Sequence, residues 1–510
     1  MEQVDHWGGD NGGRPIFVPS HRPPARPDRT GAVGSNFLME LHVSLVGRDD
    51  LTGEIYRQLR RAILDGRLPP GERLPPTREL ARRLAVSRST VTVAYDRLTG
   101  EGFLSGRPGS GTFVSDHVAA YAASARPAAS ALRPRELWHA IEPPDVFRPV
   151  AFDFRNGIPD ARLFPFQTWR RLLTRELHAD AEGIGTYADP AGHPGLRQAI
   201  ARHVGTARGV RTTAEDIVVT NATQQAVDVV ARVLLAPGDR VAVEDPGYRP
   251  PRRLLASLGA QVTGVPVDDQ GLVVDAIPAG TRLVYVTPSH QFPLGMTMPL
   301  PRRLALLDWA ERHDAAIVED DYDSEFRYGD RPIEPLQTLD TSGRVIYVGS
   351  FSKTMLPTLR LGFVIAPASL HAAVRTAKFV TDWHTTLPAQ AALARFIDEG
   401  YLARHVRKMR QVYQGRHRLL STGLRDLLGD RLEVLPSAAG LHLTALAPGL
   451  TCAGIDAALH RAEAAGAELQ PLSMYDVGSP RRAGIVPGYG AIPAERIEEG
   501  LTVLRRCFGP

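Results

Sequence analysis

Cysteine is scarce in this chain of 510 residues, which contains only Cys452 and Cys507, far apart in the sequence. So few cysteines argue against a disulfide scaffold or a zinc cluster, and they suit a reducing cytosol; no metal site is predicted. The chain also lacks an apolar run of about 18 residues and a basic-then-apolar signal at its start. We therefore expect a soluble, cytoplasmic protein with no membrane partner.

Lysine is absent from residues 51–115, although this stretch has eleven arginines against six acidic residues and therefore carries +5. Since the whole chain carries +4, the remainder sums to −1. A small basic unit on a nearly neutral body is consistent with phosphate contacts made by one part only. The charge alone would fit an ordinary solvated face equally well.

The length of the chain exceeds what one hydrophobic core usually serves, so two or three domains are expected. Residues 1–45 are rich in Gly, Pro and Arg and are predicted to form a disordered tail. Residues 46–115 should form a first compact unit. An Ala-, Ser- and Pro-rich linker over 116–150, with a short helix near Leu137, should lead to a large domain over 151–510.

The first unit begins with an amphipathic pattern, because Ile55, Leu59 and Ile63 recur every four residues. A Pro- and Gly-rich segment then breaks helicity, and Thr77 can cap a second helix. After a short turn, a third helix is predicted over residues 88–98. This succession predicts a helix-turn-helix.

A two-stranded wing is predicted from Phe103 to Val114, around a glycine-rich turn that lets the backbone lie close to a phosphate strand. The unit is therefore read as an α+β winged helix-turn-helix whose third helix enters the major groove of double-stranded DNA. The residues of the third helix that are expected to face outward include Arg88, Ser89, Thr92 and Tyr95.

The stretches Leu74–Ala81 and Val86–Val91 resemble the GntR family of bacterial regulators in order and spacing. The resemblance implies operator DNA as a partner, with Arg78 and Arg88 among its contacts. Some members of the family carry an arginine where this chain has Thr92, and a winged helix used only for protein contacts is the alternative. The complete predicted DNA-binding set is Arg78, Ser87, Arg88, Ser89, Thr90, Tyr95, Arg107 and Gly109.

From Phe152 onward, short apolar strands alternate with amphipathic helices, which predicts a mostly parallel α/β sheet. Open sheets of this kind bind ligands where their strands end, and polar residues follow several of the predicted strands. The clearest strands are predicted at 217–220, 240–243, 283–287, 316–319 and 345–348.

Lys353 follows one of these strands, in the run Ser-Phe-Ser-Lys at 350–353. Its amine can form a Schiff base with an aldehyde, while the hydroxyls of Ser350 and Ser352 and the guanidinium of Arg360 can hold a phosphate. Pyridoxal 5'-phosphate uses a site of this kind.

Further cofactor ligands are predicted at neighbouring strand ends. Ala222 and Thr223 open a helix whose free amides can bind phosphate, and Tyr248 can stack on a flat ring. Asp320 can keep the pyridine nitrogen protonated, and Tyr322 can bond the phenolic oxygen of the ring. Taken one at a time, these signals also fit an ordinary helix cap or a solvated turn.

In this order the segments resemble fold-type I aminotransferases, and together with the first unit they resemble the MocR/GabR subfamily of GntR regulators. The matching stretches are Tyr187–Gly192, Glu244–Tyr248, Thr287–Pro293, Glu319–Phe326 and Ser350–Lys353. The resemblance implies a Schiff base at Lys353 and a head-to-tail homodimer in which Tyr187 reaches the phosphate of the partner subunit. It assigns the phosphate to Ala222, Thr223, Ser350, Ser352 and Arg360.

Two departures from the family bear on function. Val486 stands where aminotransferases place an arginine for the substrate carboxylate, although Arg481 and Arg482 lie a few residues earlier. The usual Asn-Pro-x-Gly turn is also replaced, by Gln291–Gly295. These departures favour pyridoxal phosphate itself over an amino acid as the signal.

Three functions remain open. The first is a regulator that depends on pyridoxal phosphate and senses this compound, an amine or an amino acid. The second is a working aminotransferase with an ancillary DNA-binding domain, and the third is a GntR repressor that has lost its cofactor. The missing carboxylate arginine argues against the second, and the intact Lys353, Asp320 and Tyr322 argue against the third. We expect a sensor with at most a residual transaminase half-reaction.

Overall fold

The computed structural model describes residues 50–117, 132–141, 148–179, 186–329, 334–479 and 481–509. The predicted tail lies outside these residues, as does much of the predicted linker. The internal contacts of the chain divide it between Pro134 and Arg135 into two units, so the predicted linker straddles the boundary. None of the described helices combines the length and hydrophobicity that crossing a membrane requires.

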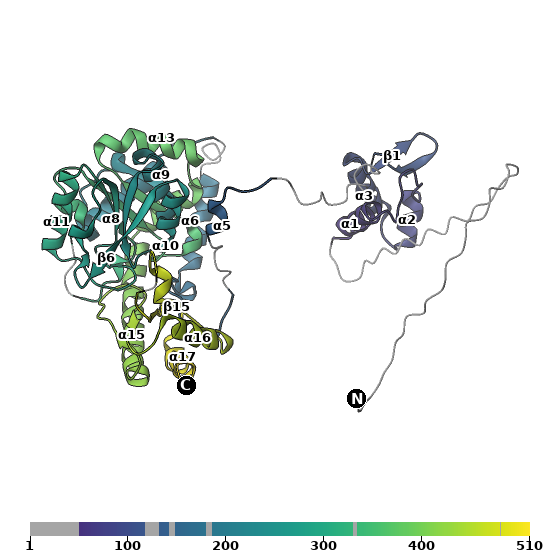
Figure 1. Ribbon diagram of the computed structural model, residues 1–510. Coiled ribbons are helices and arrows are strands. Elements are labelled where there is room, and N and C mark those ends of the chain that lie inside the picture. The colour runs from purple at the N-terminus through teal and green to yellow at the C-terminus, as the bar shows by residue number, and fades with distance from the viewer. Residues whose placement is uncertain are drawn as a thin grey trace, which may run out of the picture. The chain divides into compact units, whose positions relative to one another are not determined.

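The N-terminal unit is a winged helix-turn-helix, as predicted (Figure 1). Its elements are α1 (Leu51–Leu64), α2 (Thr77–Arg83), α3 (Arg88–Gly100), β1 (Leu104–Arg107) and β2 (Gly111–Val114). Ile55, Leu59 and Ile63 are buried in its core, and β1 pairs with β2 in antiparallel orientation. The predicted cap of α2 is wrong, because Thr77 already lies inside the helix and Pro76 occupies the capping position without a side-chain hydrogen bond.

The large unit contains the remaining elements. Its helices are α5 (Leu137–Ala140), α6 (Phe166–Ala179), α8 (Pro194–Arg208), α9 (Ala222–Leu234), α10 (Arg249–Ser257), α11 (Leu300–Arg312), α12 (Leu336–Leu339), α13 (His371–Asp382), α14 (Leu387–Asp398), α15 (Tyr401–Leu428), α16 (Cys452–Ala464) and α17 (Ala494–Cys507). Its strands are β3 (Phe152–Asp153), β4 (Ile217–Thr220), β5 (Arg240–Asp245), β6 (Gln261–Asp268), β7 (Gly271–Leu272), β8 (Thr281–Val286), β9 (Ala316–Asp321), β10 (Val345–Ser350), β11 (Gly362–Ile365), β12 (Glu433–Val434), β13 (Ala445–Leu446), β14 (Ala467–Glu468), β15 (Gln470–Pro471) and β16 (Gly484–Val486).

Eight strands form the central sheet, in the order β4-β11-β10-β9-β8-β5-β6-β7. Only β11 and β7 run against the others, so the sheet is mostly parallel, as predicted. Strands β5, β9 and β10 each extend two residues beyond the predicted end, because polar residues such as Asp320 and Asp321 stay buried there and β9 remains paired with β10 at this edge.

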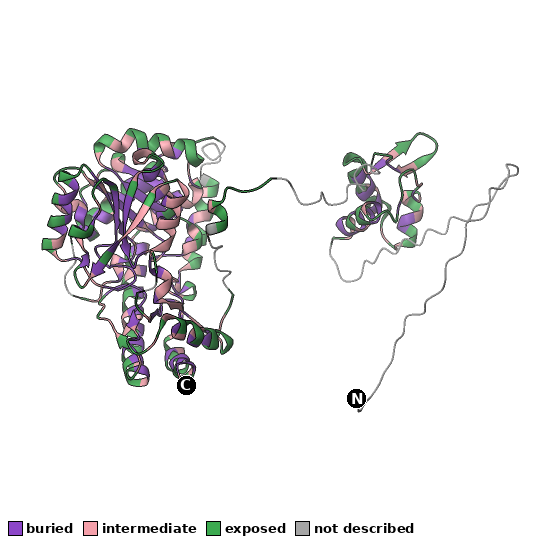
Figure 2. Ribbon diagram, viewed as in Figure 1, coloured by how far each residue is buried: buried purple, intermediate pink, exposed green. Residues whose placement is uncertain are grey.

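Helices cover both faces of this sheet, which explains why its strands are apolar almost throughout. Ile346 and Val348 of β10 pack in one core with residues of α9, α10 and α13. Tyr347, between them, packs on the other face with residues of α8 and α14. Figure 2 shows the same division, with buried strands inside and exposed outer surfaces on the helices.

A smaller region of the large unit lies beside this sheet. The four-stranded sheet β12-β13-β16-β15 packs there with α16, α17 and most of α15, around Leu424, Ile485 and Leu501. Figure 1 shows these helices gathered at the lower end of the unit. Most of the predicted cofactor residues lie at or just after the ends of the central strands.

Candidate cofactor and DNA-binding sites

Lys353 lies just beyond the end of β10 and points toward the beginning of the large unit. Its Nζ donates a hydrogen bond of 2.7 Å to the carbonyl oxygen of Gly157. Burial lowers the pKa of the Lys353 amine, against the opposing charges of Asp323 and Asp320. Gly157 has a φ of +72°, and a Cβ on it would lie 2.6 Å from Nζ, so this glycine leaves room for the lysine. Nothing in the local sequence around Gly157 predicted this contact.

Asp320 lies near the end of β9 and is 2% exposed. Its Oδ2 accepts a hydrogen bond from the Tyr285 hydroxyl, whereas its Oδ1 has no partner within the described part of the chain. Burial raises the pKa of this carboxyl to about 7. An unpartnered carboxylate oxygen close to a buried amine fits the cationic ring nitrogen of pyridoxal phosphate, which would supply the missing hydrogen bond.

Tyr322 belongs to a hydrogen-bonded group that sequence reasoning missed. Its hydroxyl donates to the carbonyl oxygen of His290 at 3.1 Å and lies 3.0 Å from His290 Nδ1. The same Nδ1 lies 3.0 Å from Oδ2 of buried Asp323. Asp323, His290 and His442 bring possible metal-ligand atoms within 4.8 Å of one another. His290 stands in a stretch matched to the family, but only the fold shows its neighbours.

The predicted phosphate ligands meet because β11 lies between β4 and β10. Gly362 pairs with Thr220 on one side and with Ser350 on the other. Arg360, just before it, donates through Nη2 to the carbonyl oxygen of Asn221 at 2.9 Å. A Cβ on Gly362 would lie 2.7 Å from Cα of Ala222, so the two loops approach closely.

The hydroxyl and amide groups of these loops can bind an anion. Ser350 Oγ accepts from the backbone amide of Ser352 at 3.1 Å. Ser352 Oγ is buried and has no partner among the residues that the structure describes. Ala222 and Thr223 begin α9, where free amides and the helix dipole favour negative charge. The donor set thus fits a phosphate group.

The two predicted aromatic residues have different surroundings. The Tyr248 ring contacts Phe292 edge to face, with 5.5 Å between ring centroids, and burial raises the pKa of its hydroxyl to about 12. Tyr187 is 76% exposed and stacks on Trp383 at 4.3 Å. Among the described residues of one chain, the Tyr187 ring contacts Trp383 and His384 and none of the residues grouped around Lys353.

The strand that carries an arginine in aminotransferases is apolar here. Val486 is fully buried on β16 in a cluster with Phe292 and Tyr475. Arg481 lies 3.3 Å from Oδ2 of Asp245, and its side chain is 55% exposed. Arg481 is thus committed to an acidic partner, which weakens it as a replacement for the missing arginine.

Several of the predicted DNA contacts lie at the start of α3, and Arg78 lies in the first turn of α2. Ser87 caps the helix, because its Oγ accepts from the Thr90 amide at 3.1 Å. Arg78, Arg88 and Ser89 are exposed. In the described residues no carboxylate lies within 4.0 Å of either arginine, so both guanidiniums can meet phosphates or bases.

Tyr95 corrects the prediction for the outer face of α3. It is only 4% exposed, and its hydroxyl donates to the carbonyl oxygen of Pro75 at 3.0 Å. Tyr95 therefore ties α3 to the segment before α2 and cannot reach DNA without leaving the core. On the wing, Gly109 and Arg107 are exposed, and Arg107 lies over the Phe113 ring and 3.7 Å from Asp116.

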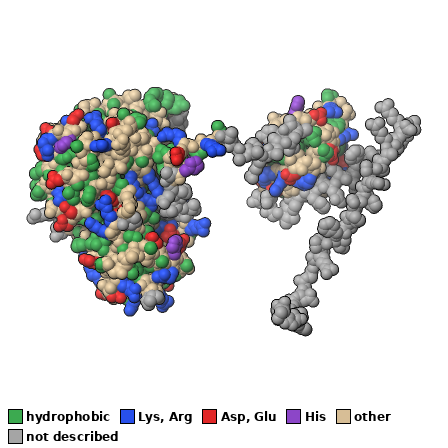
Figure 3. Space-filling view, in the orientation of Figure 1, with side chains coloured by type: hydrophobic (Ala, Val, Ile, Leu, Met, Phe, Trp, Pro, Cys, Tyr) green, Lys and Arg blue, Asp and Glu red, His purple; other side chains and the backbone are tan. Residues whose placement is uncertain are grey.

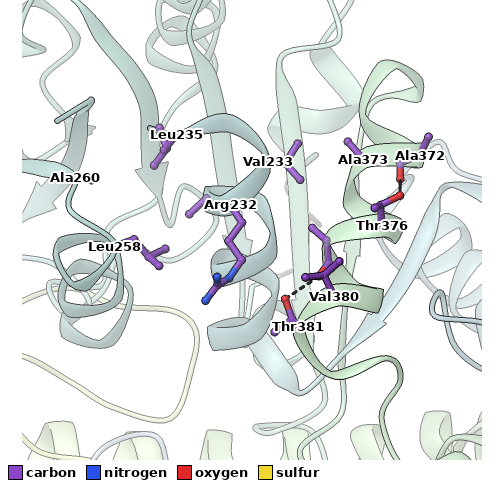
Figure 4. A pocket seen from close by; sticks show the side chains of 12 residues that line it. Arg232, Val233, Leu235, Leu258, Ala260, Ala372, Ala373, Thr376, Val380 and Thr381 are labelled. Carbon is purple, nitrogen blue, oxygen red and sulfur yellow. Dashed lines mark hydrogen bonds between the residues drawn. The ribbon is translucent and has the colours of Figure 1, made fainter. Parts of the chain in front are cut away.

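A cavity of about 920 Å³ lies elsewhere in the large unit, between α9, α13 and the end of α10 (Figure 4). Apolar side chains such as Val233, Leu235 and Val380 line it, and Arg232 is the one charged group there. None of the predicted cofactor residues belongs to it. The volume of a cavity therefore does not identify the cofactor site of this protein.

Comparison with known proteins gives matches for both units. Residues 51–114 match the family model of bacterial regulatory proteins, gntR family, and residues 155–461 match aminotransferase class I and II. The probable rhizopine catabolism regulatory protein MocR of Rhizobium meliloti is 41% identical, over 89% of this chain and 93% of its own length. The pyridoxine biosynthesis transcriptional regulator PdxR of Corynebacterium glutamicum is 34% identical, over 86% and 91%.

Among solved structures, the kynurenine aminotransferase of Pyrococcus horikoshii is similar to the large unit. It has a TM-score of 0.65 and 27% identity, and the match covers 74% of this chain and 95% of the enzyme. An archaeal alanine:glyoxylate aminotransferase gives a TM-score of 0.66 at 27% identity, over 70% of this chain and 90% of its own. The large unit thus has the fold of these enzymes.

Proposed function

The chain belongs to the GntR family of bacterial regulators, in the branch that also carries an aminotransferase class I and II domain, and we propose that this domain is its sensor. The protein is a DNA-binding transcriptional regulator. The sensor would take pyridoxal phosphate as cofactor and respond to that compound or to an amine or amino acid. Its partner would be operator DNA in the cytoplasm.

The residues around Lys353 would each bind a different part of such a cofactor. Pyridoxal phosphate, when bound, supplies an aldehyde that reacts with primary amines and a ring that withdraws electrons. Lys353 offers an amine whose lowered pKa leaves more of it neutral and nucleophilic. Asp320 offers a free carboxylate oxygen to the ring nitrogen, and Tyr322 a hydroxyl oriented by His290.

The single observation that carries the proposal is the unpartnered Oδ1 of Asp320, buried in electrostatic contact with Lys353. A buried carboxylate oxygen without a partner is costly, and a fold keeps one where a ligand completes it. The assembly would be a head-to-tail homodimer, in which exposed Tyr187 reaches the phosphate of the partner subunit.

The test is the visible absorbance of the full chain after pyridoxal phosphate is added, followed by borohydride reduction and peptide mapping. The sequence has three lysines, Lys353, Lys378 and Lys408, so the mapping has few possible outcomes. Lys353→Ala should abolish the covalent link because Lys378 pairs with Asp382 and Lys408 is exposed on α15. Exposed Lys408→Ala is the matched control and should keep it. A reduced adduct on Lys378 or Lys408 in the unaltered protein would overturn the assignment.

A working aminotransferase is the second candidate, favoured by the joint presence of Lys353, Asp320 and Tyr322. Buried Val486 speaks against it, since an apolar side chain cannot pair with a substrate carboxylate. Steady-state transamination over a panel of amino acids distinguishes the two. Turnover with one amino acid would favour the enzyme, whereas a change in operator affinity without turnover would favour the sensor.

A further inference from the structure

A second, arginine-rich pocket of about 690 Å³ lies in the large unit, between the end of α8, the short helix η4 (Ser324–Phe326) and the α14–α15 junction. Its lining contains none of the residues assigned to the cofactor. On the visible face of the large unit, basic and acidic side chains are interspersed (Figure 3). The pocket differs, because its charged lining is mostly arginine: Arg202, Arg208, Arg327, Arg407 and Arg410, against Glu325 and Asp398.

Three of these arginines lack an acidic partner among the described residues. In the part of the chain that the structure describes, no carboxylate lies within 4.0 Å of Arg327, Arg407 or Arg410. Arg410 donates only to the carbonyl oxygen of Gly329, at 3.2 Å. Arg327 makes only long contacts, of 3.3 Å to Ser289 O and 3.4–3.5 Å to Thr297 Oγ1. Their donors are therefore available to a ligand.

The surroundings of Arg327 favour an anion. This side chain is half-buried, and burial followed by the charge of Arg208 lowers the pKa of its guanidinium, while the charges of Asp323 and Asp321 partly offset this. Two neighbouring guanidiniums away from bulk water repel each other, and an anion between arginines removes that repulsion. Guanidinium groups also match phosphate oxygens in geometry, because each can donate two parallel hydrogen bonds.

We propose that this pocket binds a small phosphate monoester, whose phosphate is held by Arg327, Arg407 and Arg410. The dianion matches three guanidiniums without acidic partners, and the cavity has room for an organic part beyond the phosphate. This site is separate from the cofactor site and goes beyond the proposed function. It gives the regulator a second input.

The floor of the pocket is connected to the cofactor residues. Buried Arg208 donates through Nε to Asp321 Oδ2 at 2.8 Å and through Nη2 to Ser289 Oγ at 3.0 Å. Asp321 directly follows Asp320, and Ser289 directly precedes His290. An anion that draws Arg208 toward the pocket would therefore pull on both segments that hold the cofactor residues, so a hydrogen-bond network connects the two sites.

The experiment is calorimetric titration of the full chain, loaded with pyridoxal phosphate, with glycerol 3-phosphate as the probe and glycerol as the uncharged control. We expect one site per chain with a dissociation constant of about 1 mM or tighter, and no binding of glycerol. The double variant Arg407→Gln/Arg410→Gln should lose at least about tenfold in affinity, since two charge-assisted contacts go. Arg418→Gln, an exposed arginine on the same helix, is the matched control.

Lys353→Ala should bind the probe like the unaltered protein, which separates this pocket from the cofactor site and from a failure of the proposed function. Arg327→Gln provides a second variant if the double variant fails to fold, as judged by its melting curve. Binding of the probe that survives in all pocket variants would overturn the proposal, as would no binding to the unaltered chain. It would also be overturned if the variants lost only operator affinity, because the pocket would then serve DNA.

Discussion

The two units of this protein build their binding sites in opposite ways. The DNA-binding unit places exposed side chains at one helix start, where Ser87 and Arg88 are neighbours in sequence. The large unit gathers Gly157, Asp320 and Lys353 from distant parts of the chain and buries their reactive groups. Recognition of a polyanion needs charge that water can reach, whereas carbonyl chemistry needs charge that water cannot screen.

Unfolding the N-terminal unit alone tests whether the two binding sites are independent of each other. Leu59→Ala should destabilise the N-terminal unit by about 2–5 kcal/mol, because Leu59 is fully buried in its core. Operator binding should be lost, while visible absorbance with pyridoxal phosphate is retained. The measurement is thermal unfolding followed separately by circular dichroism and by cofactor absorbance. A joint loss of both signals would show that the units fold as one.

The burial of carboxylates in the large unit predicts a pH dependence of stability. The pKa of Asp320, Glu244 and Glu319 is raised to about 7 in each case, mainly by burial. Because these pKa values lie above those of the unfolded chain, the folded state binds the three protons more tightly. The contribution of these groups to the free energy of unfolding is complete below the unfolded pKa and is lost as the pH rises through about 7.

Each such group can contribute a slope of up to about 1.4 kcal/mol per pH unit in cofactor-free protein. Denaturant unfolding between pH 5 and 8 measures the slope, and Asp320→Asn should make it shallower. Loading with pyridoxal phosphate should do the same, since the ring nitrogen favours the ionised carboxylate. An unchanged slope in Asp320→Asn would contradict the assignment of this residue.

On the DNA side, Arg88→Ala should cost about 1–3 kcal/mol of operator affinity and relax specificity, because Arg88 is placed to read a base. The measurement is binding to specific and scrambled DNA over a salt series. Arg61→Ala, an 81% exposed arginine on α1, is the control and should change little. Equal losses on both DNA sequences would make Arg88 a phosphate contact.

The smallest expected effect belongs to Tyr95. Tyr95→Phe removes one buried hydrogen bond to Pro75 and should lower stability by about 0.5–1.5 kcal/mol. Sequence specificity should stay the same, because the hydroxyl points into the core. Altered specificity with unchanged stability, measured by the same DNA titrations and by urea unfolding, would restore Tyr95 to the DNA face.

The spacing of apolar residues predicted both folds, and strand ends predicted Lys353 and Asp320, because both signals are local in the chain. The mistake at Tyr95 was avoidable: it lies four residues after Val91 and three before Leu98, which is the buried side of a helix. Gly157 and His290 were beyond prediction, since their roles depend on contacts across the fold. The arginine-rich pocket was missed for the same reason.

The end of strand β9 connects the cofactor site with the arginine-rich pocket. Asp320 and Asp321 are adjacent, so their side chains point to opposite faces of the sheet, one toward the Lys353 amine and the other toward Arg208. A single-residue insertion before them would exchange the two faces and remove both pairings at once. The cofactor site and the arginine-rich pocket thus lie on the two faces of the same strand. A change in the register of β9 would alter both.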